Sequence, residues 1–307
     1  MLSQRSFTVL TLIFAYMMWS TGFVLVKVTT AAFGALPAMT LRMLPPLLVY
    51  LVLWKKVQPE RWHKEDYKWL ALMVLCDPIG SIGFQTQALP LTTASQSGMI
   101  FACLPLLMAI TSRLLFKETL TRRCVMGIVL AFFGVILVAL TGKASARAPN
   151  PILGNLLSFC GISCLLCYTL AVKHLAARYK PYTLLCVQAV GAALIQIPLF
   201  LIFFPGVEAM AGVPWTMYAA VAYMGFFPAC LGYFLVNRAI FLVKAAHVSL
   251  LNTLVPVFVL IIGYVFLGER LQPLQYMGAA LVLGGAVLAG MPDESQTKSA
   301  LRSTQSS

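Results

Sequence analysis

The sequence predicts an all-α integral membrane protein with ten transmembrane helices, arranged as two inverted five-helix repeats. Three observations lead to this prediction: long apolar runs, an uneven distribution of basic residues, and an internal repeat. Of the 307 residues, 60% are hydrophobic and 10% are charged, whereas an average soluble domain has about 25% charged residues. Strands of a membrane barrel would alternate polar and apolar residues. The segments here are apolar on every face, so helices are expected.

Each apolar run is long enough to cross the ~30 Å hydrocarbon core of a bilayer as a helix. A polar stretch, GKASARAPN at 142–150, separates the fifth and sixth of these runs. The expected spans are 7–27, 35–54, 68–89, 93–116, 123–141, 152–172, 182–204, 215–236, 245–267 and 273–290.

The basic residues predict the orientation of these spans. With the amino terminus in the cytoplasm, sixteen Lys and Arg side chains fall in cytoplasmic loops and tails and four on the outer side. Cytoplasmic loops of membrane proteins carry such an excess. We therefore expect both termini in the cytoplasm and a bacterial inner (plasma) membrane location. The formal net charge of +13 is dispersed over these loops, which indicates the lipid bilayer rather than nucleic acid as the partner.

The internal repeat relates KETLTRRCVMG at 117–127 to GERLQPLQYMG at 268–278. Residues 88–140 and 239–291 share 12 identities in 53 ungapped positions, all at one offset of 151. Because each unit holds five spans, the second unit enters the membrane from the opposite face, and inverted repeats are a recurrent build of secondary transporters. The expected units are 7–141 and 152–291, joined by the loop at 142–151. Residues 292–307 should form a disordered cytoplasmic tail.

Several short motifs make the chain resemble the EamA-type transporters of the drug/metabolite transporter superfamily, over nearly its whole length. They are Ala15, Trp19, Ser20, Phe23 and Lys27 in the first span, Arg42 in the second, Ala88 and Leu89 before the fourth, Pro105 and Pro256, and the pairs Glu118/Leu120 and Glu269/Leu271. One departure is Leu165, where second copies in this family usually carry an aromatic residue. The resemblance implies export, or sometimes uptake, of small metabolites such as amino acids. It also implies alternating access and a cavity lined by helices 1, 3, 4, 6, 8 and 9.

Asp77 is the acidic residue that lies deep within an expected span. It is about 13 Å along its helix, where a carboxylate costs roughly 2.5–3.5 kcal/mol to insert. Two roles are open. It could be protonated or paired with Arg42, which would make both residues structural. Alternatively it could bind an ammonium group or carry a proton on a cavity wall shared with Ser81, Phe84 and Gln85, which follow on the same helical face.

Two prolines in corresponding positions, Pro105 and Pro256, should kink helices four and nine, because proline removes one helical hydrogen bond. Polar residues lie near both kinks, and we expect Ser97 and Asn252 to contact substrate or to join helices. His247 could relay protons or be an ordinary interfacial imidazole. Aromatic residues could complete the cavity wall; the candidates are Trp19, Phe23, Phe101, Tyr168 and Phe227.

The paired acids Glu118 and Glu269 each end a helix just before the next begins, so we expect them to be structural, by capping and loop closure. Small residues form faces on the fifth and tenth spans that permit close helix approach; they are Gly127, Ala131, Gly134, Gly278, Gly285 and Ala289. These faces could pack against each other or against a second copy of the chain, as in a homodimer.

The chemistry that would indicate an enzyme is missing from the sequence. It has no Ser-His-Asp set, and its adjacent carboxylates lie in a Lys-rich loop and in the C-terminal tail, whereas catalysis needs clusters of such groups at one site. The eight cysteines lie in or beside apolar runs, where Cys is usually a small hydrophobe, so we expect no metal and no cofactor. The predicted function is export of a small amphipathic metabolite, amino acid or amine-like. The alternatives are a nucleotide-sugar exchanger of the same superfamily and a membrane enzyme or scaffold.

Overall fold

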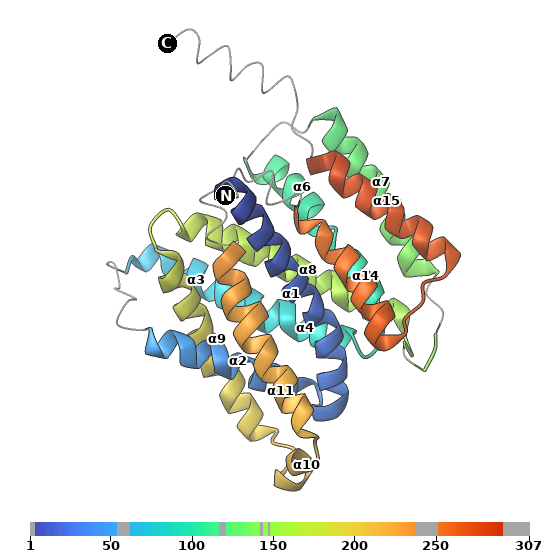
Figure 1. Cartoon of the computed structure of the whole chain (residues 1–307). Helices are drawn as coiled ribbons and strands as arrows, with labels where there is room; N and C mark the ends of the chain where they lie inside the picture. Colours follow the sequence, from blue (N-terminus) through green and yellow to red (C-terminus); the bar gives the residue numbers. More distant parts are fainter. Residues whose placement is uncertain are drawn as a thin grey trace, which may run out of the picture.

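A computed structural model describes residues 4–53, 62–116, 121–141, 144–146, 148–236 and 251–290. This part of the chain is helical and carries no strand apart from an isolated bridge between Ser145 and Ala148. The helices are drawn in Figure 1. They are α1 (Gln4–Phe33), α2 (Ala35–Val52), η2 (Lys64–Asp66), α3 (Tyr67–Val74), η3 (Leu75–Gly80), α4 (Ser81–Ala88), α5 (Ala94–Phe101), α6 (Leu104–Phe116), α7 (Arg122–Leu140), α8 (Pro151–Leu175), α9 (Pro181–Ile202), α10 (Val207–Ala211), α11 (Trp215–Met224), η4 (Gly225–Gly232), α14 (Leu254–Leu267) and α15 (Pro273–Gly290).

Seven helical segments of the described chain are long and apolar enough to cross a membrane. They are Thr8–Phe33, Ala35–Val52, Lys64–Ala88, Ala94–Thr111, Pro151–Leu175, Pro181–Ile202 and Trp215–Val236. Large apolar side chains such as Leu114, Leu194 and Phe266 are exposed on the outside of the bundle, where a soluble protein would place polar groups. The protein is therefore a multi-pass integral membrane protein.

Local chemistry sets several helix ends. The side chains of Thr93 and Asn150 accept hydrogen bonds from backbone N–H groups in the first turns of α5 and α8, as N-caps do. Proline occupies the first position of α9, at Pro181, where the missing N–H costs nothing. Gly34 and Gly268 have positive φ angles of 83° and 60°, which let the chain turn directly after α1 and α14.

Two of the long segments are interrupted rather than continuous. η3 and η4 are wound as π-helix, and each contains a proline, Pro78 and Pro228. Asp77, directly before Pro78, has an extended backbone with φ −146° and ψ 126°. Proline disfavours helical geometry in the preceding residue and removes a backbone donor. The expected straight spans 68–89 and 215–236 are therefore broken near their middle.

The other pair of prolines also lies beside helix interruptions. The helix that begins at Ala94 ends at Phe101 and resumes at Leu104, just before Pro105. In the second half, α14 begins at Leu254, with a turn at Thr253, just before Pro256. The interruptions occur where the two prolines were expected to kink their helices.

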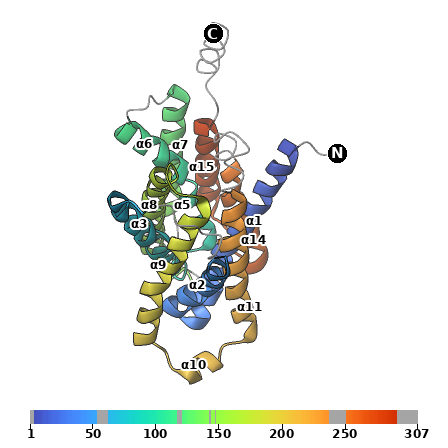
Figure 2. The same ribbon diagram turned by 90° about the vertical axis from the view of Figure 1, so that its left-hand side faces the viewer.

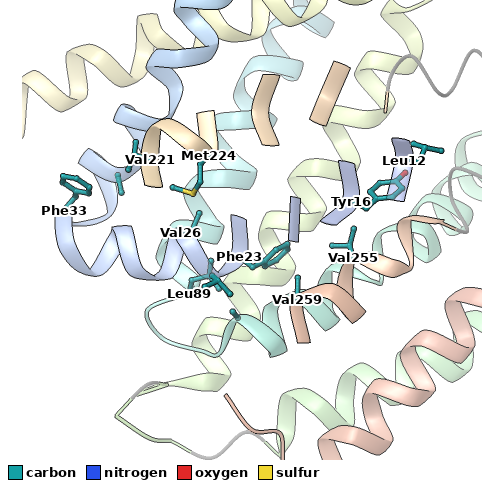
Figure 3. Packing of buried hydrophobic residues seen from close by; sticks show 13 residues of the cluster. Leu12, Tyr16, Phe23, Val26, Phe33, Leu89, Val221, Met224, Val255 and Val259 are labelled. Carbon is teal, nitrogen blue, oxygen red and sulfur yellow. The ribbon is translucent and has the colours of Figure 1, made fainter. Parts of the chain in front are cut away.

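The largest core cluster joins α1 to α11 and α14 (Figure 3). Tyr16 and Phe23 lie beside Val255 and Val259 of α14, while the far end of α1 meets α11 through Met224. Helices from both halves of the chain thus pack on α1. The first and last described helix ends, at Gln4 and Gly290, lie at the upper end of the bundle in Figures 1 and 2, and α10 lies at the lower end.

The small-residue faces of α7 and α15 pack against each other, side by side at one edge of the bundle (Figure 1). A β-carbon at Gly285 would lie 2.5 Å from the carbonyl oxygen of Gly127 and 2.8 Å from the amide nitrogen of Ala131. Only glycine permits this approach of two backbones. The faces expected to join two helices or two chains are used within one chain.

We expect Gly285→Ala to destabilise the protein by about 1–3 kcal/mol, because the new methyl group would overpack a contact made by backbone atoms. Gly284→Ala is the matched control, since its β-carbon would meet only Leu130 Cδ2, at 4.0 Å. Thermal unfolding of both purified variants in detergent checks this. Equal melting temperatures would contradict the tight α7–α15 contact.

Candidate functional site

A cavity of about 370 Å³ lies within the bundle. That volume is in the range of small-molecule sites. Both halves of the chain line it, and nine of the eleven side chains expected to contact substrate are on its wall. They are Trp19, Phe23, Asp77, Ser81, Gln85, Ser97, Phe101, Tyr168 and Asn252.

The structure places the other two aromatic candidates outside the cavity. Phe84 and Phe227 are 37% and 44% exposed and do not line the wall. Regular helical spacing would put Phe84 on the same face as Asp77. The π-helical turn at η3 inserts extra chain, and such turns shift the register of the residues that follow. Gln85, the next residue, was also expected on this face and does line the cavity. Two further candidates, His247 and Glu118, lie outside the described residues.

Asp77 is 2% exposed and its carboxylate is well supplied with donors. The hydroxyl of Ser81 donates to Oδ1. Gln188 Nε2 donates to Oδ2 at 2.7 Å, and the Tyr233 hydroxyl donates to the same oxygen at 3.3 Å. Tyr168 donates to Gln188 Oε1 at 3.3 Å. Among the described residues, Oδ1 accepts a hydrogen bond from Ser81 alone, so the carboxylate can accept one more.

Arg42 lines the same cavity from α2 and is 9% exposed. The structure shows no ion pair between Arg42 and Asp77, although their charges are close enough to interact. Among the described residues, Nε and Nη1 of Arg42 have no hydrogen-bond partner. The proposed direct pair of these residues is therefore not formed, because Ser81, Gln188 and Tyr233 hold the carboxylate instead.

The second and seventh expected spans, which correspond to α2 and α9, were not among the helices expected to line the cavity, yet both do. α2 contributes Arg42 and Tyr50, and α9 contributes Gln188. Gln188 was not anticipated, yet the sequence holds a signal for it: an amide in the apolar run 182–204. A polar side chain at that depth is costly unless it has a partner. Its partners are the Asp77 side chain and backbone oxygen, the latter at 3.2 Å.

Aromatic rings form the apolar part of the wall. Trp19 Nε1 donates to the carbonyl oxygen of Pro228 at 2.8 Å, a contact between α1 and the broken helix η4. Its ring lies 4.9 Å from that of Tyr233. Phe23 and Phe101 meet edge to face at 5.7 Å, a favoured aromatic geometry. This wall can take an apolar group, and the polar residues around Asp77 can take a charged or hydrogen-bonding group.

A second polar cluster holds the start of α5. Glu269, between α14 and α15, is 7% exposed and accepts hydrogen bonds from the backbone N–H groups of Ala94 and Ser95 at 2.9 and 3.0 Å. It also accepts from Ser95 Oγ at 2.8 Å and pairs with Lys27 Nζ at 3.3 Å. Lys27 donates to the carbonyl oxygen of Thr92 at 2.6 Å. We call these five residues the Glu269 cluster. Its carboxylate caps a helix of the other half of the chain, rather than its own.

Other hydrogen bonds extend from this end toward the cavity. Asn155 Nδ2 donates to Gln96 Oε1 at 2.9 Å, and Thr92 contacts both side chains. Ser158 donates to Ser97 Oγ at 3.0 Å, and Ser97 and Ser158 both line the cavity. This network joins α5 to α8, so Ser97 connects helices as well as facing the cavity. In the described part of the chain, no group of three His, Cys, Asp or Glu side chains could hold a metal ion.

The chain matches the EamA-like transporter family twice, over residues 6–140 and 152–291. It is 28% identical over 248 residues to the uncharacterized transporter YyaM of Bacillus subtilis, covering 79% of each chain. It is 26% identical to the uncharacterized transporter sll0355 of Synechocystis, covering 89% of this chain and 87% of that one.

A further relative is a probable terminal-alkyne amino-acid exporter of Streptantibioticus cattleyicolor. It is 24% identical, with 71% of this chain and 72% of the relative covered. A protein of known crystal structure has a similar fold, with a TM-score of 0.60 and 21% identity over 93% of this chain and 98% of its own.

Proposed function

Because the chain belongs to the EamA-like transporter family of the drug/metabolite transporter superfamily, we propose that it exports a small amphipathic metabolite, an amino acid or an amine-like compound. The observation that carries this proposal is the central cavity, which combines the Asp77 carboxylate with amide, hydroxyl and aromatic groups. The amino-acid exporter among its relatives supports the substrate class.

We propose alternating access around this cavity, in a bundle of ten spans built from inverted units at 7–141 and 152–291. The prolines of the broken helices, Pro78 and Pro228, support the repeat because they occupy similar places in the two units. Interrupted helices of this kind line the central sites of many transporters. The positions of the first and last helix ends in Figures 1 and 2 support termini on one side. That side is the cytoplasm of a bacterial inner membrane by the excess of Lys and Arg.

The Glu269 cluster supports the proposal that the cavity is closed at one end of the bundle in this structure. Its bonds join α1, the start of α5 and the connection between α14 and α15. These three elements come from both proposed units. In the alternating-access mechanism, the cluster separates when the cavity opens on that side.

The charges and rings that line the cavity favour a small metabolite over a nucleotide sugar as the substrate. A nucleotide sugar carries several negative charges, which would need several cations. Among the described residues that line the cavity, Arg42 is the basic one. The aromatic wall formed by Trp19, Phe23 and Phe101 also suits an apolar group better than a second phosphate.

The test is efflux from proteoliposomes that contain the purified protein and are loaded with labelled amino acids and primary amines. We expect at least one compound of these classes to leave faster than from protein-free liposomes. Nucleotide sugars, loaded in parallel, should leave at the protein-free rate. Release of nucleotide sugars alone, or of none of the compounds, would contradict the proposed function.

A further inference from the structure

Arg42 is a buried basic side chain that lacks hydrogen-bond partners for part of its guanidinium group. It is 9% exposed, and its Nε and Nη1 atoms have no hydrogen-bond partner among the described residues. Burying an unpaired guanidinium is costly. A carboxylate in direct contact would compensate for it, but Arg42 and Asp77 do not form an ion pair. Among the described residues, Nε and Nη1 of Arg42 therefore remain available as donors.

The position of Arg42 is set by tight packing of the backbone. A β-carbon at Gly225 in η4 would lie 2.7 Å from the carbonyl oxygen of Arg42 and 2.6 Å from Pro45 Cγ. α2 therefore lies directly against the broken helix of the second half at this residue. A side chain that starts from a fixed backbone loses less entropy when it binds a ligand.

We propose that Arg42 binds the carboxylate group of the substrate. This inference rests on the proposed function and narrows its substrate class to compounds that carry a carboxylate. The planar guanidinium matches the two oxygens of a carboxylate. A bound carboxylate would supply the partner that the described residues do not supply.

The rest of the cavity matches the remainder of such a substrate. Arg42 and Asp77 are the two charged side chains among the described residues of the wall, and they do not form an ion pair with each other. A zwitterion can therefore place its carboxylate on Arg42 and its ammonium group on Asp77. The rings of Trp19, Phe23 and Phe101 leave an apolar surface for a side chain. An α-amino acid with an apolar side chain fits all three features.

The test is ligand-induced thermal stabilisation of the purified protein, because a ligand that binds the folded state raises its melting temperature. The probes are the proteinogenic amino acids and, for each stabilising one, its carboxamide and the matching carboxylic acid without the amino group. We expect amino acids with apolar side chains to stabilise the wild type. Their carboxamides should bind at least tenfold more weakly.

Arg42→Met is the variant that separates the two roles of this residue. The unliganded variant should melt no lower than the wild type, because no hydrogen bond of Nε or Nη1 is lost. The affinity of Arg42→Met for the amino acid should fall at least tenfold, to the affinity that the wild type has for the carboxamide. Arg42→Lys should retain part of the wild-type affinity for the amino acid. Arg270→Met, an exposed basic residue, is the control and should bind as the wild type does.

Three results would overturn the inference. One is equal stabilisation of the wild type and Arg42→Met by the same amino acid. Another is stabilisation by amines that lack a carboxylate but not by amino acids. The third is no stabilisation by any carboxylate. Efflux of amines from proteoliposomes would then show that the transport function stands while the role of Arg42 does not.

Discussion

Asp77→Asn is expected to reduce transport at least tenfold while leaving the amount of folded protein unchanged. Asparagine has nearly the same shape and keeps one acceptor oxygen, so the contacts with Gln188 or Tyr233 can persist in part. It has no negative charge, so it can neither attract an ammonium group nor carry a proton. Losing one buried charge partner of a ligand costs about 2–5 kcal/mol. Initial rates of efflux from proteoliposomes measure the effect.

The matched control is Glu208→Gln, which removes a carboxylate of the short helix α10 that is exposed. Its transport should equal that of the wild type. The sodium dodecyl sulfate gel band and the melting temperature of each variant report on folding. If Asp77→Asn transports at the wild-type rate, Asp77 serves only to hold η3, α9 and the chain directly after η4 together through its hydrogen bonds.

Glu269→Ala is expected to have the largest effect on stability, because it would remove four interactions at once. The variant would leave the buried N–H groups of Ala94 and Ser95 without their acceptor and Lys27 without its ion-pair partner. Removing one member of a buried pair costs roughly 3–5 kcal/mol. We therefore expect a clear fall in the melting temperature of the purified protein.

Arg270→Ala is the control for this experiment, since Arg270 is the next residue and is exposed. Its melting temperature should match that of the wild type. Glu269→Gln should fall between the two, because the amide keeps one acceptor oxygen and no charge. A Glu269→Ala protein as stable as Arg270→Ala would show that the Glu269 cluster contributes little to the folded state.

Helical periodicity predicted part of the cavity wall near Asp77 but erred where the helix is broken. From Asp77 it placed Ser81, Phe84 and Gln85 on one face, and Ser81 and Gln85 do line the cavity. Phe84 turns outward because η3 is π-helical around Pro78. The proline was visible in the sequence, yet its effect on the register depends on how the surrounding helices hold the broken turn.

Hydrogen bonds between residues far apart in the sequence were the part of the site that the sequence predicted least well. Arg42 and Asp77 are the buried opposite charges of the apolar spans, which favoured an ion pair. The partners of Asp77 include Gln188 and Tyr233, which are 111 and 156 residues away. No periodic pattern relates residues so far apart, so only the tertiary structure, which brings Gln188 and Tyr233 to η3, reveals these contacts.

The sequence by itself determined the helical membrane class and the family, and it predicted nine of the side chains that line the cavity. These follow from apolar runs and short motifs, which are local properties of the chain. Only the tertiary structure decided which polar groups find partners. It satisfied Asp77 and Glu269 with donors from distant helices, and it left Nε and Nη1 of Arg42 without an acceptor among the described residues. The physical reason is that a buried charge is stabilised by groups that approach it in space, and folding alone brings them together.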